Sequence, residues 1–310
     1  MSEKNEMIRD DLFTLLPEEE KNSEFITVES KTFFKDTWDR FRKNKLALFG
    51  LIFIVIMILC AIIIPMVSPY SFDAQDLANK NSLPSLAHPF GTDKLGRDIL
   101  VRVMYGARIS LAIGFSTALI NLVIGVIYGG ISGFVGGRVD MIMMRIIDII
   151  YAVPTLLYVI LILLIFGNNV GSMMLAICLT SWITMARQVR AQVLSLKEQE
   201  FALAAKVLGA SNKRILLKHL VVNALGPIIV CETMMVPSAI FTESFLSFVG
   251  IGLDPTIPSW GKLANDCRPL IFTYPIQIIW PIAAICLTVL SLNFIGDGIG
   301  EALQTKKGRD

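Results

Sequence analysis

The chain has 310 residues, of which 54% are hydrophobic and only 17% are charged, and its mean hydropathy is +0.63. A soluble globular domain carries about 25% charged residues, so this composition excludes a soluble enzyme and predicts an all-α polytopic membrane protein. The net charge of +2 provides no general attraction for nucleic acid.

The segment before the first apolar run divides into two parts. Residues 1–30 are acidic and lack the apolar core of a secretory signal peptide, which predicts a solvated cytoplasmic tail. In residues 31–45, Phe34, Trp38 and Phe41 recur at helical spacing among basic residues. This pattern predicts an amphipathic helix on the inner membrane surface. A cytoplasmic helix that packs on the protein itself is the alternative.

Residues 46–310 contain six runs that are long and apolar enough for membrane-spanning helices, each of which needs about 20 residues. The charge-free run from Ile149 to Met185 is divided into two spans, because Gly167-Asn168-Asn169 interrupts it. The predicted spans are Leu46–Val67, Ile109–Gly137, about 141–166, about 170–186, about 220–248 and about 274–295. They leave an outer loop at 68–108, a cytoplasmic loop at 187–219 and an outer segment at 249–273.

Lysine and arginine residues set the predicted orientation. With the N-terminus inside, eighteen of them fall on the inner side of residues 31–310 and seven on the outer side. Cytoplasmic loops carry the excess of basic residues in membrane proteins. The sequence therefore predicts that both termini are cytoplasmic.

No reactive set of residues is apparent, so we expect no catalytic residue, no metal and no bound cofactor. The only Gly-Lys pair, Gly261-Lys262, is not part of a phosphate-binding loop, and the two histidines, His88 and His219, fall on opposite sides of the membrane. Five cysteines are scattered singly. Ser132, within a Gly-Ile-Ser-Gly stretch typical of intramembrane serine proteases, has no histidine at membrane depth and is interpreted as a packing residue.

Two carboxylates, Glu232 and Glu243, lie inside the fifth predicted span. Eleven residues at about 100° each return to nearly the same helix face, about 16 Å further along. Acidic residues within a membrane are costly unless they face water or a partner. The two glutamates therefore either line a translocation path or form hydrogen bonds with neighbouring helices. Arg145 and Asp148 are more simply a local ion pair.

The cytoplasmic loop contains a short helix with small side chains. Residues from Glu200 read as a helix, with a turn at Gly209 to Ser211 and a second helix from about Asn212, for which Ser211 is the expected N-cap. Ala204, Ala205 and Leu208 form a slim apolar face. A helix of this kind can enter a groove on another protein, so the sequence predicts a docking element.

The cytoplasmic loop and three further stretches of the chain resemble a known family. Leu203-Ala204-Ala205-x-x-x-Gly209, followed by His219-Leu220-Val221-Val222, resembles the EAA loop of bacterial ABC-importer permeases. Three further stretches resemble the C-type permease of the oligopeptide/dipeptide importers: His88–Asp98, Phe245–Leu253 with Pro258–Gly261, and Asn293–Gly298. Together the matches extend over residues 34–304.

The loop departs from the family pattern at two places. Leu203 replaces the first glutamate of the motif, and Val221-Val222 replaces its Leu-Pro end. Glu200, one turn upstream, could replace the missing glutamate only if the helix is rotated. The ATPase-coupling residues implied by the resemblance are Glu200, Leu203, Ala204, Ala205, Gly209, Ala210 and Ser211.

The resemblance implies a type I ABC-importer fold and a division of labour. A second homologous permease would complete the pathway, two cytoplasmic ATPase subunits would hydrolyse ATP with Mg²⁺, and an extracytoplasmic binding protein would deliver peptide to this bacterial inner-membrane assembly. The outer-loop motif would face the binding protein or brace the partner permease; its residues are Gly91, Asp93, Gly96, Arg97 and Asp98.

Other functions stay open at this stage. A proton-coupled secondary transporter would suit Glu232, although no paired repeats are visible between the two halves. The same family mechanism could import nickel or another small solute. An intramembrane protease and a purely structural assembly factor are further alternatives.

Overall fold

The computed structural model describes residues 33–303, and the predicted acidic tail at 1–30 lies outside this range. The chain divides into two units, Met1–Asp36 and Thr37–Asp310, and the following description concerns the second. The elements are α2 (Phe33–Phe41), α3 (Lys45–Val67), the 3-10 turn η3 (Leu77–Asn79), α4 (Ile99–Val135), α5 (Gly137–Ala152), α6 (Thr155–Phe166), α7 (Val170–Leu196), α8 (Glu200–Val207), α9 (Asn212–Arg214), the π-helical segment η4 (Ile215–Leu220), α10 (Val221–Asn223), α11 (Leu225–Val249), α12 (Trp260–Cys267), the 3-10 turn η5 (Arg268–Leu270) and α13 (Ile276–Leu303).

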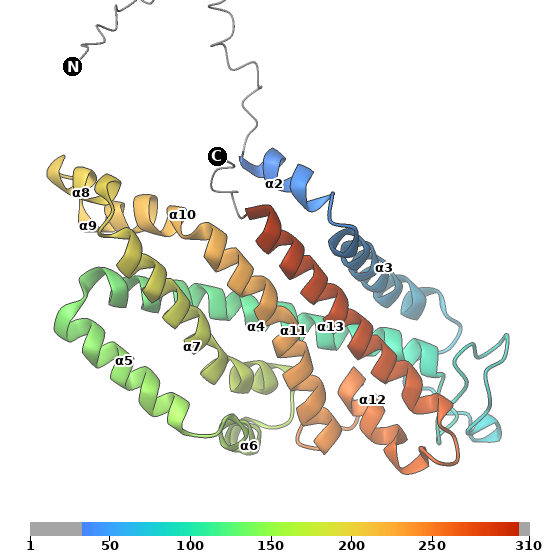
Figure 1. Cartoon of the computed structure of the whole chain (residues 1–310). Helices are drawn as coiled ribbons and strands as arrows, with labels where there is room; N and C mark the ends of the chain where they lie inside the picture. The colour runs from blue at the N-terminus through green and yellow to red at the C-terminus, as the bar shows by residue number, and fades with distance from the viewer. Residues whose placement is uncertain (1–32, 304–310) are drawn as a thin grey trace, which may run out of the picture. The chain divides into compact units, whose positions relative to one another are not determined.

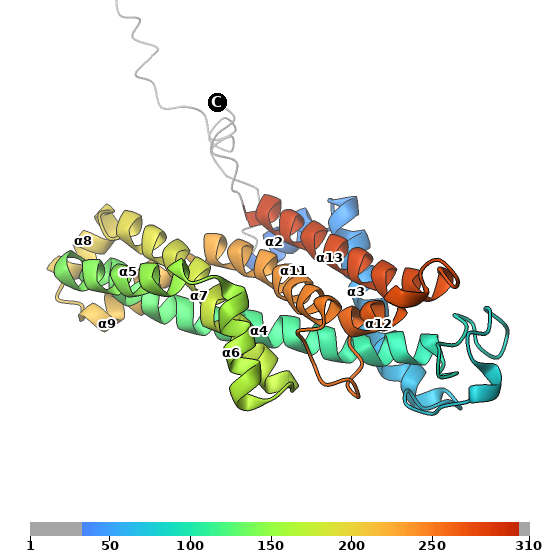
Figure 2. The same cartoon turned by 90° about the horizontal axis from the view of Figure 1, so that it is seen from below.

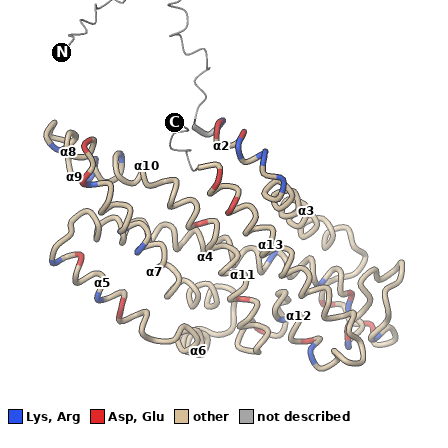
Figure 3. The backbone as a smooth tube through the Cα atoms, in the orientation of Figure 1, with Lys and Arg blue, Asp and Glu red and all other residues tan. Residues whose placement is uncertain are grey.

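Five of the described helices, α3, α4, α7, α11 and α13, are long and apolar enough to cross a membrane. A sixth crossing requires α5 and α6 to act together as one bent span. The predicted all-α polytopic class is confirmed. Beyond its first residue α3 contains no charged residue, whereas Lys and Arg gather on α2 and at helix ends (Figure 3).

The third predicted span is not one straight helix. Its two parts, α5 and α6, meet at an angle of 80°. The break falls at Val153-Pro154, because proline lacks an N–H and disfavours helical geometry in the residue before it. The Tyr158 hydroxyl donates to the carbonyl of Ile150, four residues before the proline, at 3.2 Å. The length and apolar character of the run, from which the span was predicted, did not reveal this bend.

Helix α4 begins ten residues earlier than the predicted second span, so residues 99–108, expected in the outer loop, are helical. The Asp98 carboxylate accepts a hydrogen bond from the Val101 N–H at 2.8 Å and caps the helix. At about 1.5 Å per residue, 37 residues extend about 55 Å, well beyond a hydrocarbon core of about 30 Å. At least one end of α4 therefore projects beyond the membrane core.

Helices α4 and α7 pack with their backbones in close contact. Gly125, Gly129 and Gly133 recur every four residues on α4, and a side chain at any of them would collide with α7 at Met185, Ala186 or Arg190. Small residues at such spacing allow membrane helices to approach closely. Helices α4 and α7 thus form the most tightly joined pair of the unit.

An arginine of α4 compensates for a proline within α3. Pro65 cannot donate to the carbonyl of Ala61. Arg108 donates from Nε to the Ala61 carbonyl at 2.6 Å and from Nη2 to the Ile62 carbonyl at 2.8 Å. This polar contact fixes the end of α3 against α4.

Helix α11 is central in the unit. It lies between α7 and α13, with α4 crossing behind all three (Figure 1), and the view from below places α4 under the same layer (Figure 2). The short helix α12 packs against the last turns of α11. These neighbours leave one side of α11 open.

Candidate functional site

The end of the unit that carries α8 has the predicted helix–turn–helix form. Gly209 has a φ of +79°, a left-handed conformation that glycine adopts without a steric penalty. The Ala210 N–H donates to the Ala205 carbonyl at 3.0 Å, which closes the end of α8. The Ser211 hydroxyl accepts from the Arg214 N–H at 3.4 Å and caps α9, as predicted.

Helix α8 presents an apolar face to its surroundings, although not the one predicted. Leu203 and Ala204 are exposed, and Val207 and Leu208 are 87% and 86% exposed. Ala205 lies on the opposite side, only 9% exposed, where its small side chain packs against the same subunit. Glu200 is exposed at the start of the helix. The open face therefore runs from Leu203 to Leu208 without Ala205.

A nearly continuous helical path joins this tip to α11. It passes through α9, the π-helical segment η4 and α10. Ile215 and Leu220, at the two ends of η4, are buried in the main core. The Ala224 N–H donates to the Leu220 carbonyl at 2.9 Å and links η4 to the start of α11. The turn at Gly209 is therefore joined to α11 by a short and nearly continuous helical connection.

The two glutamates share one stripe of α11, as predicted, but this stripe is the packed one. Glu243 is completely buried: Ser110 of α4 donates to its carboxylate at 3.0 Å and Ser247 at 2.9 Å. Ser110 in turn accepts from the Trp260 N–H of α12 at 3.3 Å. Glu243 therefore joins α4, α11 and α12, and the hydrogen-bonding interpretation is the one that its surroundings favour.

Glu232 lies on the same side of α11 and is half-buried. One of its carboxylate oxygens is enclosed and has no hydrogen-bond partner among the described residues. The same stripe carries the buried Ile228, Val236 and Ile240. Glu232 consequently faces the core of its own subunit rather than the open side of the helix.

The open side of α11 carries a different set of residues, which sequence reasoning missed. They recur every three or four positions: Pro227, Cys231, Met234, Ser238, Phe241, Phe245 and Val249. Toward the α8 end this face borders a hollow of about 530 Å³ between α7, α11 and α13. The sequence contained only an indirect signal for this face. If Glu232 and Glu243 face inward, the opposite side of the same helix faces outward.

The outer-loop motif folds the loop between α3 and α4. Gly91 and Gly96 have positive φ angles, +78° and +73°. The Asp93 carboxylate accepts from the Leu95 N–H at 2.9 Å and from the Arg97 N–H and side chain at 3.0 and 2.7 Å. Asp98 caps α4 and lies 2.8 Å from the ring nitrogen Nδ1 of His88. These residues hold the loop in shape instead of offering a free polar surface.

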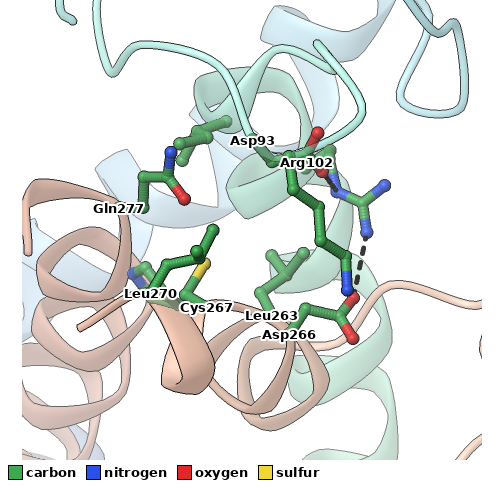
Figure 4. A pocket seen from close by; sticks show the side chains of 10 residues that line it. Asp93, Arg102, Leu263, Asp266, Cys267, Leu270 and Gln277 are labelled. Atoms are coloured by element: carbon green, nitrogen blue, oxygen red, sulfur yellow. Dashed lines mark ion pairs between the residues drawn. The ribbon is translucent and has the colours of Figure 1, made fainter. Parts of the chain in front are cut away.

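The same loop is fastened to α12 and α13 (Figure 4). The buried Arg102 side chain lies between Asp93 and Asp266, at 3.8 and 3.7 Å. Gln277 of α13 donates to the backbone carbonyl of Thr92 at 3.0 Å. Only a small cavity of about 20 Å³ remains between these groups, and burial raises the pKa of the Cys267 thiol beside it to about 12. The most exposed apolar side chains at this end are Leu86 and Phe272.

Ser132 lies where α4, α5 and α7 meet. The Ser132 hydroxyl donates to Asp140 at 2.5 Å, and Arg190 binds the same carboxylate at 2.5 and 2.6 Å. Ser132 therefore belongs to a structural brace between α4, α5 and α7. No group of three or more His, Cys, Asp or Glu residues in this range could hold a metal ion.

Comparison with known proteins identifies the family. Residues 121–309 match the family described as "Binding-protein-dependent transport system inner membrane component". The chain belongs to this family. Residues 32–87 match a second family, the N-terminal transmembrane domain of oligopeptide transport permease C. The resemblance to C-type permeases inferred from the sequence is thereby confirmed.

Close relatives carry permease names. The chain is 50% identical over 285 residues to the oligopeptide transport system permease protein OppC of Bacillus subtilis, and the alignment covers 92% of this chain and 93% of that protein. It is 44% identical over 308 residues to DppC, the dipeptide transport system permease of the same organism, covering 99% and 96%. OppC of Escherichia coli K12 is 42% identical over 289 residues, covering 93% and 96%.

A solved structure supports the fold. A chain of the inward-facing MetNI methionine ABC transporter aligns with a TM-score of 0.55 and 18% identity, over 67% of this chain and 97% of that chain. The predicted type I importer fold is confirmed by this likeness.

Proposed function

We propose that the chain is one of two homologous permease subunits in an ATP-driven importer of oligopeptides or dipeptides. The extensive identity to OppC and DppC proteins supports the substrate class. The observation that carries the mechanism is an exposed apolar helix tip that connects through continuous helix to the central helix of a membrane bundle.

Two cytoplasmic ATPase subunits bind and hydrolyse ATP with Mg²⁺, and one of them receives α8 in a surface groove. Leu203, Ala204, Val207 and Leu208 make the apolar contact. Because Leu203 replaces the glutamate of the family motif, this contact depends on burial of apolar surface and not on an ion pair. Closure of the ATPases moves α8, and η4 and α10 transmit this movement to α11.

The remaining partners follow from the orientation set by the basic residues. The α8 end and both termini lie in the cytoplasm, and the loop at 68–98 lies outside with α12. An extracytoplasmic binding protein docks on this outer end, where Leu86 and Phe272 are fully or almost fully exposed. The outer-loop motif supports this platform from inside.

Leu208→Asp tests the coupling role, and Phe272→Asp is the matched control at the opposite end of the unit. Both replace a highly exposed apolar side chain, 86% and 99% exposed, so neither change disturbs the core. In the complete complex, Leu208→Asp should abolish copurification of the ATPase subunits and ATP-dependent peptide uptake. Phe272→Asp should retain the ATPases. Retention of the ATPases by Leu208→Asp, or uptake driven by a proton gradient without them, would overturn the proposal.

A further inference from the structure

We propose that Arg145 of α5, held beside Arg187 and Asp148, binds the C-terminal carboxylate of the peptide as it passes the subunit. The inference rests on the proposed importer function and deepens it, because it names a chemical group that all substrates of this class share and the residue that recognises it. The sequence predicted that Arg145 and Asp148 form a local ion pair. The structure adds Arg187 to this pair and leaves Arg145 largely open.

Asp148 is bound by the arginine of the neighbouring helix rather than by Arg145. Arg187 of α7 donates from Nη2 to the Asp148 carboxylate at 3.0 Å, and its guanidinium lies over the Tyr151 ring, 4.9 Å from the ring centre. The Arg145 guanidinium is 3.9 Å from the other oxygen of Asp148, which is beyond hydrogen-bond distance. The Arg145 side chain is 78% exposed, against 44% for Arg187. The cluster therefore holds two positive charges and one negative charge, and the excess is on Arg145.

The cluster lies at a depth where charged side chains are rare. Helix α7 begins at Val170, and Arg187 follows seventeen residues later, about 26 Å further along the axis. With Val170 at the outer edge of a hydrocarbon core about 30 Å thick, Arg187 lies near the inner edge of that core. Asp148 shares this depth, because Arg187 binds it directly. Charged side chains at such a depth face water or an oppositely charged partner.

Arg187 lies on the side of the unit that is turned away from α4. Met185 of α7 faces α4, and Arg187 follows it by two residues, about 200° around the helix. In α11, Ser238 is equally far from Ile240, which packs on α4. Gln188, next to Arg187, lines the hollow of about 530 Å³ between α7, α11 and α13. The cluster therefore shares one side of the layer with the open side of α11, because α4 crosses behind both helices (Figure 1).

A surface suited to lipid alone differs from this one. The large exposed side chains of α3 between Leu46 and Val67 are all apolar. On α7, by contrast, Thr184 is exposed one turn before Arg187 and on the same side of the helix. Exposed polar groups are costly in hydrocarbon but are satisfied by water. The polar side chains therefore favour contact of this side of α7 with water.

The chemistry of Arg145 suits a carboxylate. The planar guanidinium of arginine donates two parallel hydrogen bonds to the two oxygens of such a group. A free C-terminal carboxylate is present in peptides of any sequence, so a site for it accepts substrates with different side chains. Asp148 offsets part of the positive charge, which keeps the attraction moderate and allows the peptide to leave. The cation–π contact with Tyr151 holds Arg187, and through it Asp148, in place.

Peptides with and without the carboxylate test the site. ATP-dependent uptake of trialanine and of trialaninamide, which lacks the C-terminal carboxylate, is measured with the complete complex in vesicles. Arg145→Gln should lower the ratio of trialanine to trialaninamide uptake about tenfold relative to the unmodified complex, because a hydrogen bond between charged groups is lost. The same binding protein serves both complexes, so its own preference cancels in this comparison. Arg145→Lys keeps the charge and should retain most of the ratio. Trialanine uptake alone should fall at least fivefold in Arg145→Gln, and unchanged trialanine uptake would overturn the inference.

Arg138→Gln is the matched control. Arg138 is also exposed, and it lies two turns earlier on the same face of α5. Its replacement should leave trialanine uptake within twofold of the original, and an equal loss in both variants would indicate a general effect of charge and overturn the inference. Copurification of the second permease subunit and of anionic lipid is measured in the same preparations. Loss of either in Arg145→Gln with an unchanged uptake ratio would assign Arg145 to that contact instead. If the unmodified complex imports no peptide with ATP, the importer function fails; if it does and Arg145→Gln has no effect, only this site fails.

Discussion

Gly209→Val should loosen the tip that we assign to ATPase docking, through backbone strain alone. Gly209 has a φ of +79°, and nothing lies within 4 Å of the position of an added Cβ. A side chain therefore meets no steric obstacle, and the cost is the left-handed backbone, about 1–2 kcal/mol for a residue with a Cβ. A difference of this size changes a local equilibrium by a factor of about 5–30. A β-branched residue lies at the upper end of this range.

The assay is amide hydrogen exchange of the segment 200–214 in the purified complex, together with copurification of the ATPases. The Ala210 amide donates the hydrogen bond to the Ala205 carbonyl that closes α8. Its proton should exchange about 5–30 times faster in Gly209→Val than in the unmodified protein. Gly209→Asn is the control, because asparagine tolerates the left-handed conformation and should remain near the original rate. Exchange in Gly209→Val equal to that of the unmodified protein would refute the argument from backbone strain.

Three further predictions concern the packed core and the outer end. Glu243→Leu deprives three serine hydroxyls of their acceptor and should lower the free energy of unfolding by about 1–3 kcal/mol, while Glu243→Gln keeps one acceptor oxygen and should cost less. Thermal unfolding in detergent measures both, and a Leu variant as stable as the original would contradict the assignment. Arg108→Met removes both donors to the α3 carbonyls and should cost about 1–2 kcal/mol in the same assay; an unchanged midpoint would show that Arg108 contributes nothing there. Because burial raises the pKa of Cys267 to about 12, its thiol stays protonated at pH 8 and should react with N-ethylmaleimide at least a hundredfold more slowly than Leu86→Cys until the protein is unfolded. Similar rates in the folded protein would contradict the burial.

Local signals in the sequence predicted the α8 region well. The turn at Gly209 follows from the conformational freedom of glycine, and the Ser211 cap follows from the hydrogen-bonding preference of serine at helix starts. Both features depend on neighbours within a few residues. The direction in which α8 faces depends on the packing of Ala202 and Ala205 against distant helices, so the sequence placed Ala205 on the wrong side.

The bend between α5 and α6 and the start of α4 show the same limit. Hydropathy measures whether a segment is apolar, and the run around Val153-Pro154 is apolar on both sides of the bend. Arg102 and Arg108 made residues 99–108 look like a loop. Both arginines are accommodated inside the protein, Arg102 between Asp93 and Asp266 and Arg108 on the α3 carbonyls. Only contacts between distant segments explain how charged residues join a long helix.

The two glutamates in α11 show what helical periodicity can and cannot predict. Their spacing correctly placed them on one stripe of α11, but periodicity alone does not say whether a polar stripe faces water or a partner. Glu243 faces Ser110, a residue 133 positions away, and this contact turns the whole stripe inward. Once one residue of a helix is fixed, the 3.6-residue period assigns every other side chain to a face. The hydrogen bond of Glu243 therefore also determines that Ser238 and Phe241 face outward.

This geometry constrains how movement can pass through the permease. Helices α4 and α7 are held together by the Gly125–Gly133 contacts, so a shear between them would separate closely packed backbones. Helix α11 touches them through larger side chains, and it alone continues into the π-helical segment below α8. Pro237 removes one backbone hydrogen bond near its middle and provides a place to bend. A displacement of α8 is therefore expected to bend or rotate α11 against a rigid α4–α7 pair. Its open face would then change width while the Glu243 contact keeps the other end in place.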